Sequence, residues 1–570
     1  MVVKKAVNGD FRKLLLTAFI FSGMAALIYE ITWIRPLQFL LGSTIYTISI
    51  IFATFMLGLA LGSLIISKHI DKTKNLPKTY ALLEIGIGLY GILLLSIFNL
   101  LPKVYNSLYF LHTNFYLFEA VQFLLVFLVL LIPTTLMGAT FPVMAKFYTQ
   151  EKIGKGIGEV YSANNLGAVI GSFAAGFILI PLFGITASII FAGAINLLIA
   201  LIILPRVDKQ FSKKILPVVI AVFILLAFVG NYNIKQMHSG GFYRTHPEVK
   251  TMGEIVYYKE GVYATVTVRE LPVRGHSLFI NGYGQGGDEI QDLRVNFLLA
   301  YLPTLIKTES GNADQNASKD ALVIGLGTGM TSGQLAQLTK VTTVELEPAF
   351  VEATNYFRLF NQNVLENENH RLVVDDGRNY LLKNKEKYDV IVSEPTNTWQ
   401  SFSTQLYSKE FLEIVKEHLD ENGLFVKWVP IYTMGVEDFR SFYKTFSSVF
   451  PYTAAFANMK SDEGTPVKFE TSEVILIGSK KKIEITKDKL KENYNSLSEQ
   501  SKQYLEAIKL GSGEKIYHLL LFTGEDMQGY GKDSELVTDD RPILEFSTAK
   551  KILNQNPTAV IRDIVNFIKK

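Results

Sequence analysis

Apolar residues dominate the first 232 positions of the chain in seven long runs that short polar loops separate. The runs cover residues 14–34, 44–67, 79–101, 117–145, 159–180, 184–204 and 215–231. Runs of about 20 apolar residues are long enough to cross the hydrocarbon core of a bilayer as helices. Glycines recur four residues apart, as in Gly58 and Gly62 or Gly167 and Gly171, a spacing that lets two helices approach closely. We therefore expect a multispanning helical membrane domain over residues 1–232.

A few polar residues interrupt these runs. They are Glu30, Glu84, Glu119, Asn164 and Asn165. Polar groups are costly in hydrocarbon and mark functional positions by default, unless they lie near the interface or bond across helices. Both interpretations stay open at this point.

The hydrophobic period changes to two after the last apolar run. Strand-like segments at 255–258, 264–268 and 278–280 alternate with turns, which is typical of a small antiparallel β layer. Together with a linker and a helix over about 290–306, this layer occupies residues 233–306.

Residues 307–480 combine strand-length apolar runs with helical patterns, as α/β domains do. The domain starts with a polar insertion at 308–319, and its later part predicts a helix at 406–419, a strand at 424–429 and a helix at 436–450. A C-terminal helical tail, residues 481–570, carries the sequence TDDRPILEF at 538–546.

A glycine turn organises the α/β domain. The apolar run 322–324 stops at the sequence GLGTG, residues 325–329, and a helical segment and a second strand that ends on Glu345 follow. Glycine permits the unusual dihedral angles of such a turn and lets a ligand come close to the backbone. Glu345 follows the turn at the distance at which an acid binds the hydroxyls of a ribose. The last glycine of the dinucleotide fingerprint is replaced by Met330, which disfavours NAD, and a purely structural turn remains the alternative.

Two further predicted strands also end in acidic residues. The run 372–374 leads into Asp375, Asp376 and Gly377, and the run 388–392 leads through Ser393 into Glu394. Ligands of open α/β sheets bind at such carboxyl ends. Three acidic strand ends, with no Lys or Arg in the glycine loop, favour a cationic nucleoside over a pyrophosphate. S-adenosylmethionine and its decarboxylated form are molecules of this kind.

Composition excludes several other functions. The chain has no cysteine, which rules out disulfides, thiolate metal sites and cysteine nucleophiles, and the sequence shows no clustered His, Asp and Glu set for a metal. A net charge of +3 over 570 residues predicts no nucleic acid or other polyanionic partner.

Basic residues are distributed unevenly over the loops of the membrane domain. Segments 1–13, 68–78, 146–158 and 205–214 hold fifteen Lys and Arg residues, whereas the alternate loops hold only Arg35 and Lys103. The positive-inside rule therefore places the N-terminus in the cytoplasm. Seven complete spans would leave the C-terminal domain outside, away from any adenosyl donor. We expect a cytoplasmic domain in a multi-pass protein of the cell membrane, with the short seventh run as the first candidate for an incomplete span.

Motifs along nearly the whole chain resemble the membrane-fused, multispanning branch of the spermidine synthase family of polyamine aminopropyltransferases. They are GMAALIYEITW, YSANNLGAVIGS, LFINGYGQ, VIGLGTG, VELEP, DDGRNYL, SEPTNTW and TDDRPILEF. The resemblance implies a Rossmann-like transferase domain in polyamine biosynthesis. It also implies a donor, S-adenosylmethionine or decarboxylated S-adenosylmethionine, from whose sulfonium a group passes to an amine.

The resemblance assigns roles to residues of this chain. Gly325, Gly327 and Gly329 shape the donor turn, Glu345 holds the ribose, Asp376 with Gly377 meets the adenine amino group, Gln285 comes from the preceding β layer, and Glu394 takes the place of the proton-accepting aspartate. A positioned base that removes the proton of the amine is what the chemistry requires.

Three departures from the family alter the expected substrates. Thr328 stands where the family has an aspartate for the ammonium of the decarboxylated donor, and Asn397 replaces the second active-site aspartate. The family's tyrosine-histidine-glutamate run corresponds to Val295, Asn296 and Phe297. These neutral residues disfavour putrescine as acceptor and remove repulsion against the carboxylate of intact S-adenosylmethionine.

The leading hypothesis is a membrane-anchored, spermidine synthase-like transferase that moves an aminopropyl-type group to an amine. The amine is a small molecule or is borne by a lipid of the surrounding bilayer, and a homodimer is left open. The first alternative is an S-adenosylmethionine-dependent methyltransferase that acts on a membrane substrate. The second is a non-catalytic transporter or sensor with a nucleoside-binding domain.

Overall fold

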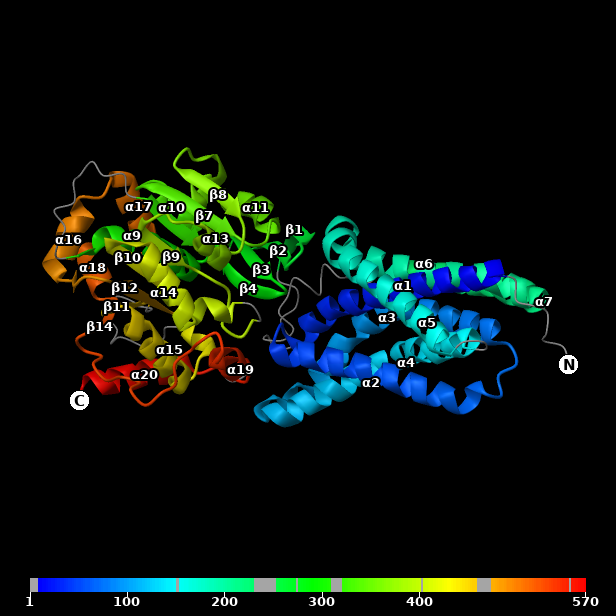
Figure 1. Cartoon of the computed structure of the whole chain (residues 1–570). Coiled ribbons are helices and arrows are strands. Elements are labelled where there is room, and N and C mark those ends of the chain that lie inside the picture. The colour runs from blue at the N-terminus through cyan, green and yellow to red at the C-terminus, as the bar shows by residue number, and fades with distance from the viewer. Residues whose placement is uncertain are drawn as a thin grey trace. The chain divides into compact units, whose positions relative to one another are not determined.

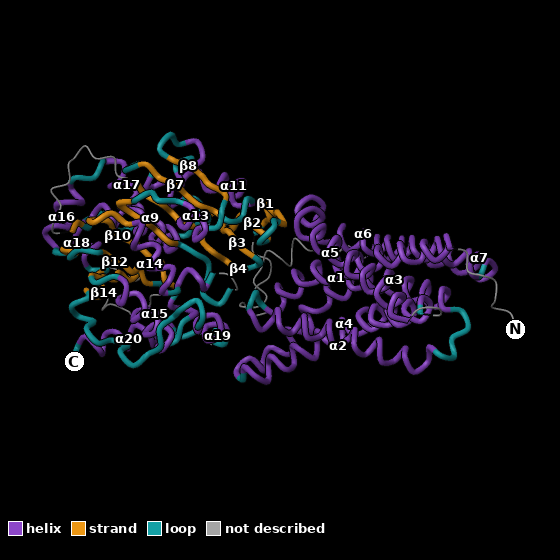
Figure 2. Tube along the Cα trace, in the orientation of Figure 1, coloured by secondary structure: helices purple, strands orange, loops and turns teal. Residues whose placement is uncertain are grey.

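The computed structural model describes residues 9–149, 153–229, 253–272, 275–308, 320–400, 403–458, 473–552 and 555–570. The polar insertion predicted at 308–319 therefore lies, after its first residue, outside the described residues. The chain divides into two compact units, residues 1–249 with 260–262 and residues 250–259 with 263–570. The first unit is built of helices, and the strands gather in the second (Figures 1 and 2).

Long helices in the first unit follow the apolar runs and extend beyond most of their ends. They are α1 (Gly9–Leu41), α2 (Ile45–Ile70), α3 (Leu76–Leu108), α4 (Phe115–Tyr148), α5 (Ile153–Ala174), α6 (Ile180–Val207) and α7 (Lys209–Val229), with short turns η1 (Tyr109–Thr113) and η2 (Ala175–Leu179). By length and composition, the described part of this unit contains six helical stretches able to cross a membrane, where the sequence predicted seven. The difference is one stretch of 55 residues, Ile153–Val207, that joins two predicted runs. Inside it Gly184 has a non-helical φ of 81°, so the predicted count of seven is approximate.

Glycines lie where helices of this unit pack most closely. A Cβ atom at Gly62 of α2 would stand 1.9 Å from the carbonyl oxygen of Thr135 in α4, and one at Gly167 of α5 would stand 1.9 Å from that of Ile20 in α1. Neither contact tolerates a larger side chain without displacing backbone. The prediction that these glycines mediate close helix packing is confirmed.

Glu84 is the most deeply buried of the polar residues singled out in the apolar runs. Its side chain is inaccessible to solvent and accepts hydrogen bonds of 2.6 Å from Ser22 Oγ of α1 and from Asn196 Nδ2 of α6. The asparagine that bonds to it is thus Asn196, whereas Asn165 is exposed. Buried polar groups need such partners, so Glu84 ties three helices together.

The second unit begins with a four-stranded sheet of order β1-β2-β3-β4. Its strands are β1 (Glu254–Glu260), β2 (Thr265–Leu271), β3 (Gly275–Ile280) and β4 (Tyr283–Gly287). Strand β3 pairs antiparallel with β2, as predicted, and also with β4, a strand that the sequence pattern did not indicate. Asn281 and Gly282 both have positive φ, 48° and 79°, which allows the tight turn between β3 and β4.

An eight-stranded sheet of order β14-β11-β12-β10-β9-β6-β7-β8 forms the centre of this unit. Its strands are β6 (Asp320–Ile324), β7 (Lys340–Glu345), β8 (His370–Val374), β9 (Tyr388–Ser393), β10 (Leu419–Val429), β11 (Tyr452–Ala457), β12 (Val474–Ser479) and β14 (Leu520–Thr523). The five strands from β10 to β8 run parallel, and β12, β11 and β14 continue the sheet in antiparallel pairs. The α/β Rossmann-like domain is therefore confirmed. A separate pair, β5 (Lys307–Thr308) and β13 (Ile483–Glu484), lies outside this sheet.

Helices and helical turns cover the sheet. They are α9 (Ile290–Leu305), α10 (Met330–Leu335), α11 (Ala349–Ala353), η3 (Thr354–Phe357), α12 (Arg358–Asn361), η4 (Val364–Glu366), α13 (Gly377–Lys383), η5 (Thr404–Tyr407), α14 (Lys409–His418), η6 (Ile431–Thr433), α15 (Val436–Val449), α16 (Lys487–Asn495), α17 (Glu499–Ala507), α18 (Gly513–Tyr517), α19 (Ile543–Ala549) and α20 (Pro557–Ile568). The predicted helices at 290–306, 406–419 and 436–450 correspond to α9, α14 and α15.

Two hydrophobic cores lie on the two faces of the sheet because successive strand residues point to opposite sides. Val426 and Trp428 of β10 belong to one core, and Phe425 and Val429 belong to the other. The C-terminal segment, residues 481–570, contributes β14 to the edge of the sheet and side chains to both cores. It is therefore part of the same compact unit as the α/β domain.

Candidate active site

The carboxyl ends of β9, β6, β7 and β8 lie side by side and carry the predicted site. Backbone hydrogen bonds join the strand ends in turn: the Glu394 amide donates to Ile324, that of Gly325 to Val344 and that of Asp375 to Glu345, at 3.1, 2.9 and 3.1 Å. The chain runs from β6 outward to β8 and then crosses to β9 on the other side of β6. The crevice at such a reversal is where open α/β sheets bind ligands.

The glycine turn after β6 has backbone angles that favour glycine. Gly325, Gly327 and Gly329 have φ values of 102°, 52° and 77°. A Cβ atom at Gly325 would also stand 2.8 Å from the carbonyl oxygen of Glu394, so the close approach of two strand ends needs glycine there. At Gly327 a Cβ atom would meet nothing within 4 Å, which leaves the backbone angle as the reason for that glycine.

Glu345 ends β7 and is buried beside the glycine turn. One carboxylate oxygen accepts the backbone N–H of Leu326 and the other accepts that of Glu347, both at 2.8 Å. Burial raises the pKa of Glu345 above its ordinary value, and these hydrogen bonds oppose the rise. A carboxylate offers about four acceptor positions, so Glu345 keeps capacity for ribose hydroxyls while the backbone fixes its orientation.

Glu347, two residues further on, has a structural role that the sequence analysis did not identify. Its carboxylate accepts the N–H groups of Tyr263, Ala264 and Ala349 at 2.8, 3.1 and 3.0 Å. The first two belong to the segment that leads into β2, so Glu347 joins the four-stranded sheet to the strand end at β7. The second acid of the motif VELEP was the only sequence signal for it.

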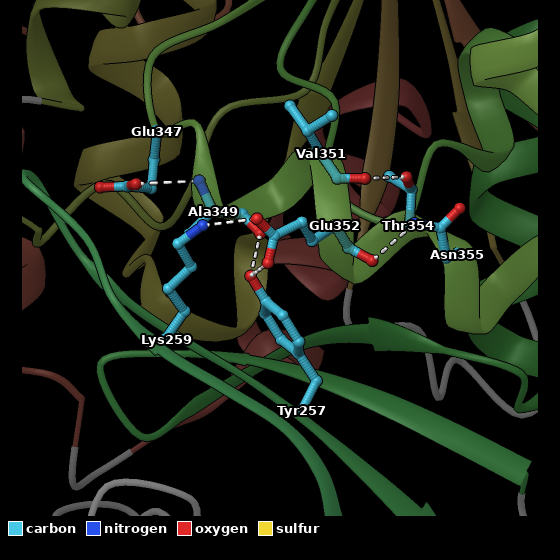
Figure 3. A network of polar contacts seen from close by, with 8 residues as sticks. All are labelled: Tyr257, Lys259, Glu347, Ala349, Val351, Glu352, Thr354 and Asn355. Atoms are coloured by element: carbon cyan, nitrogen blue, oxygen red, sulfur yellow. Dashed lines mark hydrogen bonds and ion pairs between the residues drawn. The ribbon is translucent and has the colours of Figure 1, made fainter. Parts of the chain in front are cut away.

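A second set of contacts reinforces this junction (Figure 3). Tyr257 of β1 donates to the Ala349 carbonyl oxygen at 2.8 Å, and Lys259 forms an ion pair of 2.6 Å with Glu352 of α11. Because both strand residues reach the helix that follows Glu347, the position of the four-stranded sheet is coupled to the glycine-turn region.

The four-stranded sheet brings Gln285 of β4 towards the glycine turn. A Cβ atom at its neighbour Gly286 would stand 3.8 Å from Thr328 Cγ2, so β4 and the turn are in contact. The amide Nε2 of Gln285 is buried without a hydrogen-bond partner. Thr328 itself is buried, and its carbonyl oxygen accepts from Asn361 Nδ2 at 3.0 Å. Strand β4, which carries Gln285, thus lies beside the glycine turn, which carries Thr328.

Asp376 and Gly377 lie at the carboxyl end of β8. Asp376 caps α13 by accepting the N–H of Asn379 at 2.8 Å, and it remains partly accessible. A Cβ atom at Gly377 would stand 2.5 Å from Ile324 Cγ2, so glycine lets the start of α13 approach β6. The neighbouring Asp375 forms an ion pair with Lys383, which leaves Asp376 as the acid of this strand end for a ligand.

Glu394 lies at the end of β9 and receives a hydrogen bond of 2.8 Å from Thr331 Oγ1. Burial is the main cause that raises its pKa to about 7; the Thr331 hydrogen bond opposes the rise and the charge of Glu473 adds to it. A carboxyl group with a pKa near the working pH is suited to accept a proton from a substrate. Thr331, in α10, is a residue that the sequence analysis missed because its contact joins two residues 63 positions apart in the chain.

Asn397 is fully buried, and its side-chain oxygen accepts from Tyr432 at 2.7 Å. Its Nδ2 has no hydrogen-bond partner. The tyrosine comes from the segment after β10 and was not identified from the sequence. Among the described residues no group of three or more His, Cys, Asp and Glu side chains is arranged to hold a metal ion.

Comparison with known proteins shows which enzymes this domain is similar to. Residues 303–461 match the family profile described as spermine/spermidine synthase domain. Polyamine aminopropyltransferase 2 of Aquifex aeolicus is 24% identical over 414 residues, which cover 71% of this chain and 77% of that protein. The polyamine aminopropyltransferase of Corynebacterium efficiens is 25% identical over 438 residues, covering 73% and 77%.

Among solved structures, a spermidine synthase in complex with the transition state analogue AdoDATO aligns with a TM-score of 0.37 at 20% identity, over 46% of this chain and 84% of that one. The matched domain and the aminopropyltransferase relatives indicate an aminopropyltransferase. Residues 303–461 thus match a spermine/spermidine synthase domain, and the apolar helices ahead of them fit a membrane-fused branch of that family.

Proposed function

We propose that this chain is a membrane-anchored aminopropyltransferase that transfers the aminopropyl group of decarboxylated S-adenosylmethionine to an amine. The observation that supports it best is the juxtaposition of the glycine turn, Glu345 and Glu394 at the reversal point of the sheet. That arrangement offers a nucleoside site and a proton acceptor at adjacent strand ends.

Each residue has a distinct task in the proposed reaction. The glycine turn and Glu345 hold the nucleoside, Gln285 and Thr328 face the same turn from β4 and from within it, and Asp376 is available to the adenine amino group. The amine nitrogen attacks the carbon next to the sulfonium, the C–S bond breaks, and its electron pair leaves with the neutral thioether. Glu394 takes the proton that the nitrogen loses, so charge and atoms balance.

Glu394 is placed so that its proton affinity fits this task. With a pKa of about 7, close to half of the groups are unprotonated at neutral pH. The Thr331 hydroxyl orients one carboxylate oxygen and leaves the other for the substrate.

We further propose that the apolar helices anchor the domain to the cell membrane with the transferase domain in the cytoplasm. Support comes from the six helices of membrane-spanning length and from the basic segments 1–13, 68–78, 146–158 and 205–214. The cytoplasm is also where an adenosyl donor is available. Acceptor amines then include small molecules and lipid-borne amines.

Methyl transfer from intact S-adenosylmethionine is the second candidate, and the neutral Thr328 and Asn397 favour it. Mass spectrometry of reactions with either donor, using a mixture of amines as acceptors, distinguishes the two. We expect amines heavier by an aminopropyl group, together with methylthioadenosine, from the decarboxylated donor. Methylated products and S-adenosylhomocysteine from intact S-adenosylmethionine, without aminopropyl products, would reject the proposal.

A further inference from the structure

Glu84 of α3 is a fully buried carboxyl group in the first unit, and the proposed transfer reaction does not use it. Its two oxygens accept hydrogen bonds of 2.6 Å from Ser22 Oγ of α1 and Asn196 Nδ2 of α6. Among the described residues no Lys, Arg or His side chain forms an ion pair with it. An ionisable group without a countercharge among apolar helices is costly, and such residues mark proton and ion sites by default.

The groups around Glu84 are polar and carry no positive charge. Its titratable neighbours are Tyr29 of α1 and Tyr80 of α3, whose charges would interact with that of Glu84. Helix α6 contributes the neutral Asn196, and no described charged or titratable group of α4, α6 or α7, which also pack on α3, interacts with Glu84. The ionised carboxylate is therefore stabilised by hydrogen-bond donors alone.

Close helix packing around Glu84 leaves room for little more than a proton. Gly88 lies one turn after Glu84 on α3. A Cβ atom at Gly88 would stand 3.0 Å from the Gly193 carbonyl oxygen and 3.2 Å from Asn196 Cβ. Packing this dense excludes a ligand of several atoms. The N–H group that Asn196 directs at the carboxylate also disfavours a metal cation at this position.

The side-chain amide of Asn196 can serve both protonation states of Glu84. Its Nδ2 donates to the carboxylate, whereas its Oδ1 is buried and has no hydrogen-bond partner. A half turn of the amide would direct Oδ1 at a protonated Glu84, which would then be the donor. Because the amide makes no other hydrogen bond in the structure, binding a proton leaves the number of hydrogen bonds unchanged.

Buried hydroxyl groups continue from Glu84 along the interface of α1 and α3. Tyr29 lies seven residues after Ser22 on the same face of α1, and its hydroxyl is buried without a hydrogen-bond partner. It lies against Gly91, seven residues after Glu84 on α3, and the fully buried Tyr80 lies one turn before Glu84. A hydroxyl group both donates and accepts hydrogen bonds, so it can pass on a proton. Glu84 thus has such a group on either side of it along the helices.

We propose that Glu84 is a proton-binding site of the first unit, at which the carboxylate takes up a proton from water and later releases it. Tyr29 and Tyr80 are the groups through which the proton reaches and leaves the carboxylate. Uptake forms one O–H bond on Glu84 and breaks one in the water-derived donor, and no other bond changes. The first unit then has an activity of its own, independent of the proposed transfer reaction, since an anchor alone does not require a carboxyl group enclosed by three helices.

Infrared difference spectroscopy of the full-length protein in lipid nanodiscs, between acidic and alkaline pH, tests this proposal. We expect a buried carboxylic acid band that appears on acidification of the wild type and is lost in Glu84→Gln. Glutamine has the same size and keeps an acceptor oxygen, so the helix contacts should remain. The band should persist in the control Glu159→Gln, which changes a glutamate of α5 that is 36% exposed. A band that is unchanged in Glu84→Gln, or the absence of a buried-acid band in the wild type, would overturn the inference.

Asn196→Leu provides a second test that does not depend on the folding of Glu84→Gln. Leucine removes the amide that bonds to both protonation states, so the pH midpoint of the band should move by at least about one unit, a tenfold change in proton affinity. An unmoved midpoint would overturn the inference. Replacing sodium by choline in the buffer should leave the wild-type midpoint unchanged, and a midpoint that depends on sodium would reject the proton in favour of a metal cation.

Discussion

Replacement of Glu394 by glutamine tests the proposed chemistry most directly. Glutamine has the same size and still accepts the hydrogen bond that Thr331 Oγ1 donates at 2.8 Å, so the strand end should keep its structure. It cannot accept a proton at neutral pH. A positioned general base contributes about 10²–10⁴-fold to a rate, and we expect kcat to fall by this order while donor affinity stays within about twofold.

The pH dependence of kcat/KM in the wild-type enzyme provides an independent test of Glu394 as the base. Glu394 must be unprotonated to act, and its pKa of about 7 means that lowering the pH from 7 to 6 reduces the unprotonated fraction from about one half to about one tenth. We therefore expect kcat/KM to fall on the acid side with a midpoint near pH 7, and this limb should disappear in Glu394→Gln.

Methylthioadenosine release, measured by mass spectrometry at several pH values, serves as the assay. Thr331→Val is a useful second variant because it removes the Thr331 hydroxyl, whose hydrogen bond lowers the pKa of Glu394. The acid limb of its pH profile should therefore move to higher pH. Near-wild-type turnover of Glu394→Gln, with an unaltered pH profile, would refute the assignment of Glu394 as the base.

Two further predictions concern the donor and the membrane. Glu345→Ala removes the acceptor proposed for two ribose hydroxyls. Each hydrogen bond to a charged group contributes about 1.5–3 kcal/mol, so calorimetry should show donor affinity weakened at least tenfold. Equal affinity in the variant would take Glu345 out of the site. Because the chain lacks cysteine, single cysteines at the exposed positions Thr113 and Asn495 can be labelled in intact cells without background. We expect an impermeant reagent to modify Thr113→Cys and to spare Asn495→Cys, and labelling of the latter would place the transferase domain outside.

Local patterns were sufficient to predict the elements that carry the site. Period-two alternation indicated β2 and β3, the apolar runs indicated the long helices, and the glycine turn with Glu345 indicated the strand-turn-helix-strand unit at β6 and β7. Such features depend on neighbouring residues, since backbone angles and burial periodicity are local properties. The positive φ values at Gly325, Gly327 and Gly329 show that the turn needed glycine for the reason inferred.

Sequence patterns were less informative where a segment serves as a link or an edge. Strand β4 is five residues long and rich in glycine, so it has no alternating apolar signal. Strand β14 lies in a segment whose composition is helical, and it pairs with β11 only because the sheet edge is there to receive it. The span count was approximate for another reason: the predicted runs 159–180 and 184–204 form one helical stretch, Ile153–Val207, interrupted only by the non-helical Gly184.

By itself the sequence determined the order of the elements, the glycine turn and the acids that end the strands, because each depends on residues close together in the chain. Only the tertiary structure decided which distant groups share one site. Thr331 meets Glu394, Tyr432 meets Asn397, and Asn458, which follows β11, meets Gln291 of α9, across separations of 63, 35 and 167 residues. The raised pKa of Glu394 is a property of that three-dimensional neighbourhood, and no single motif contains it.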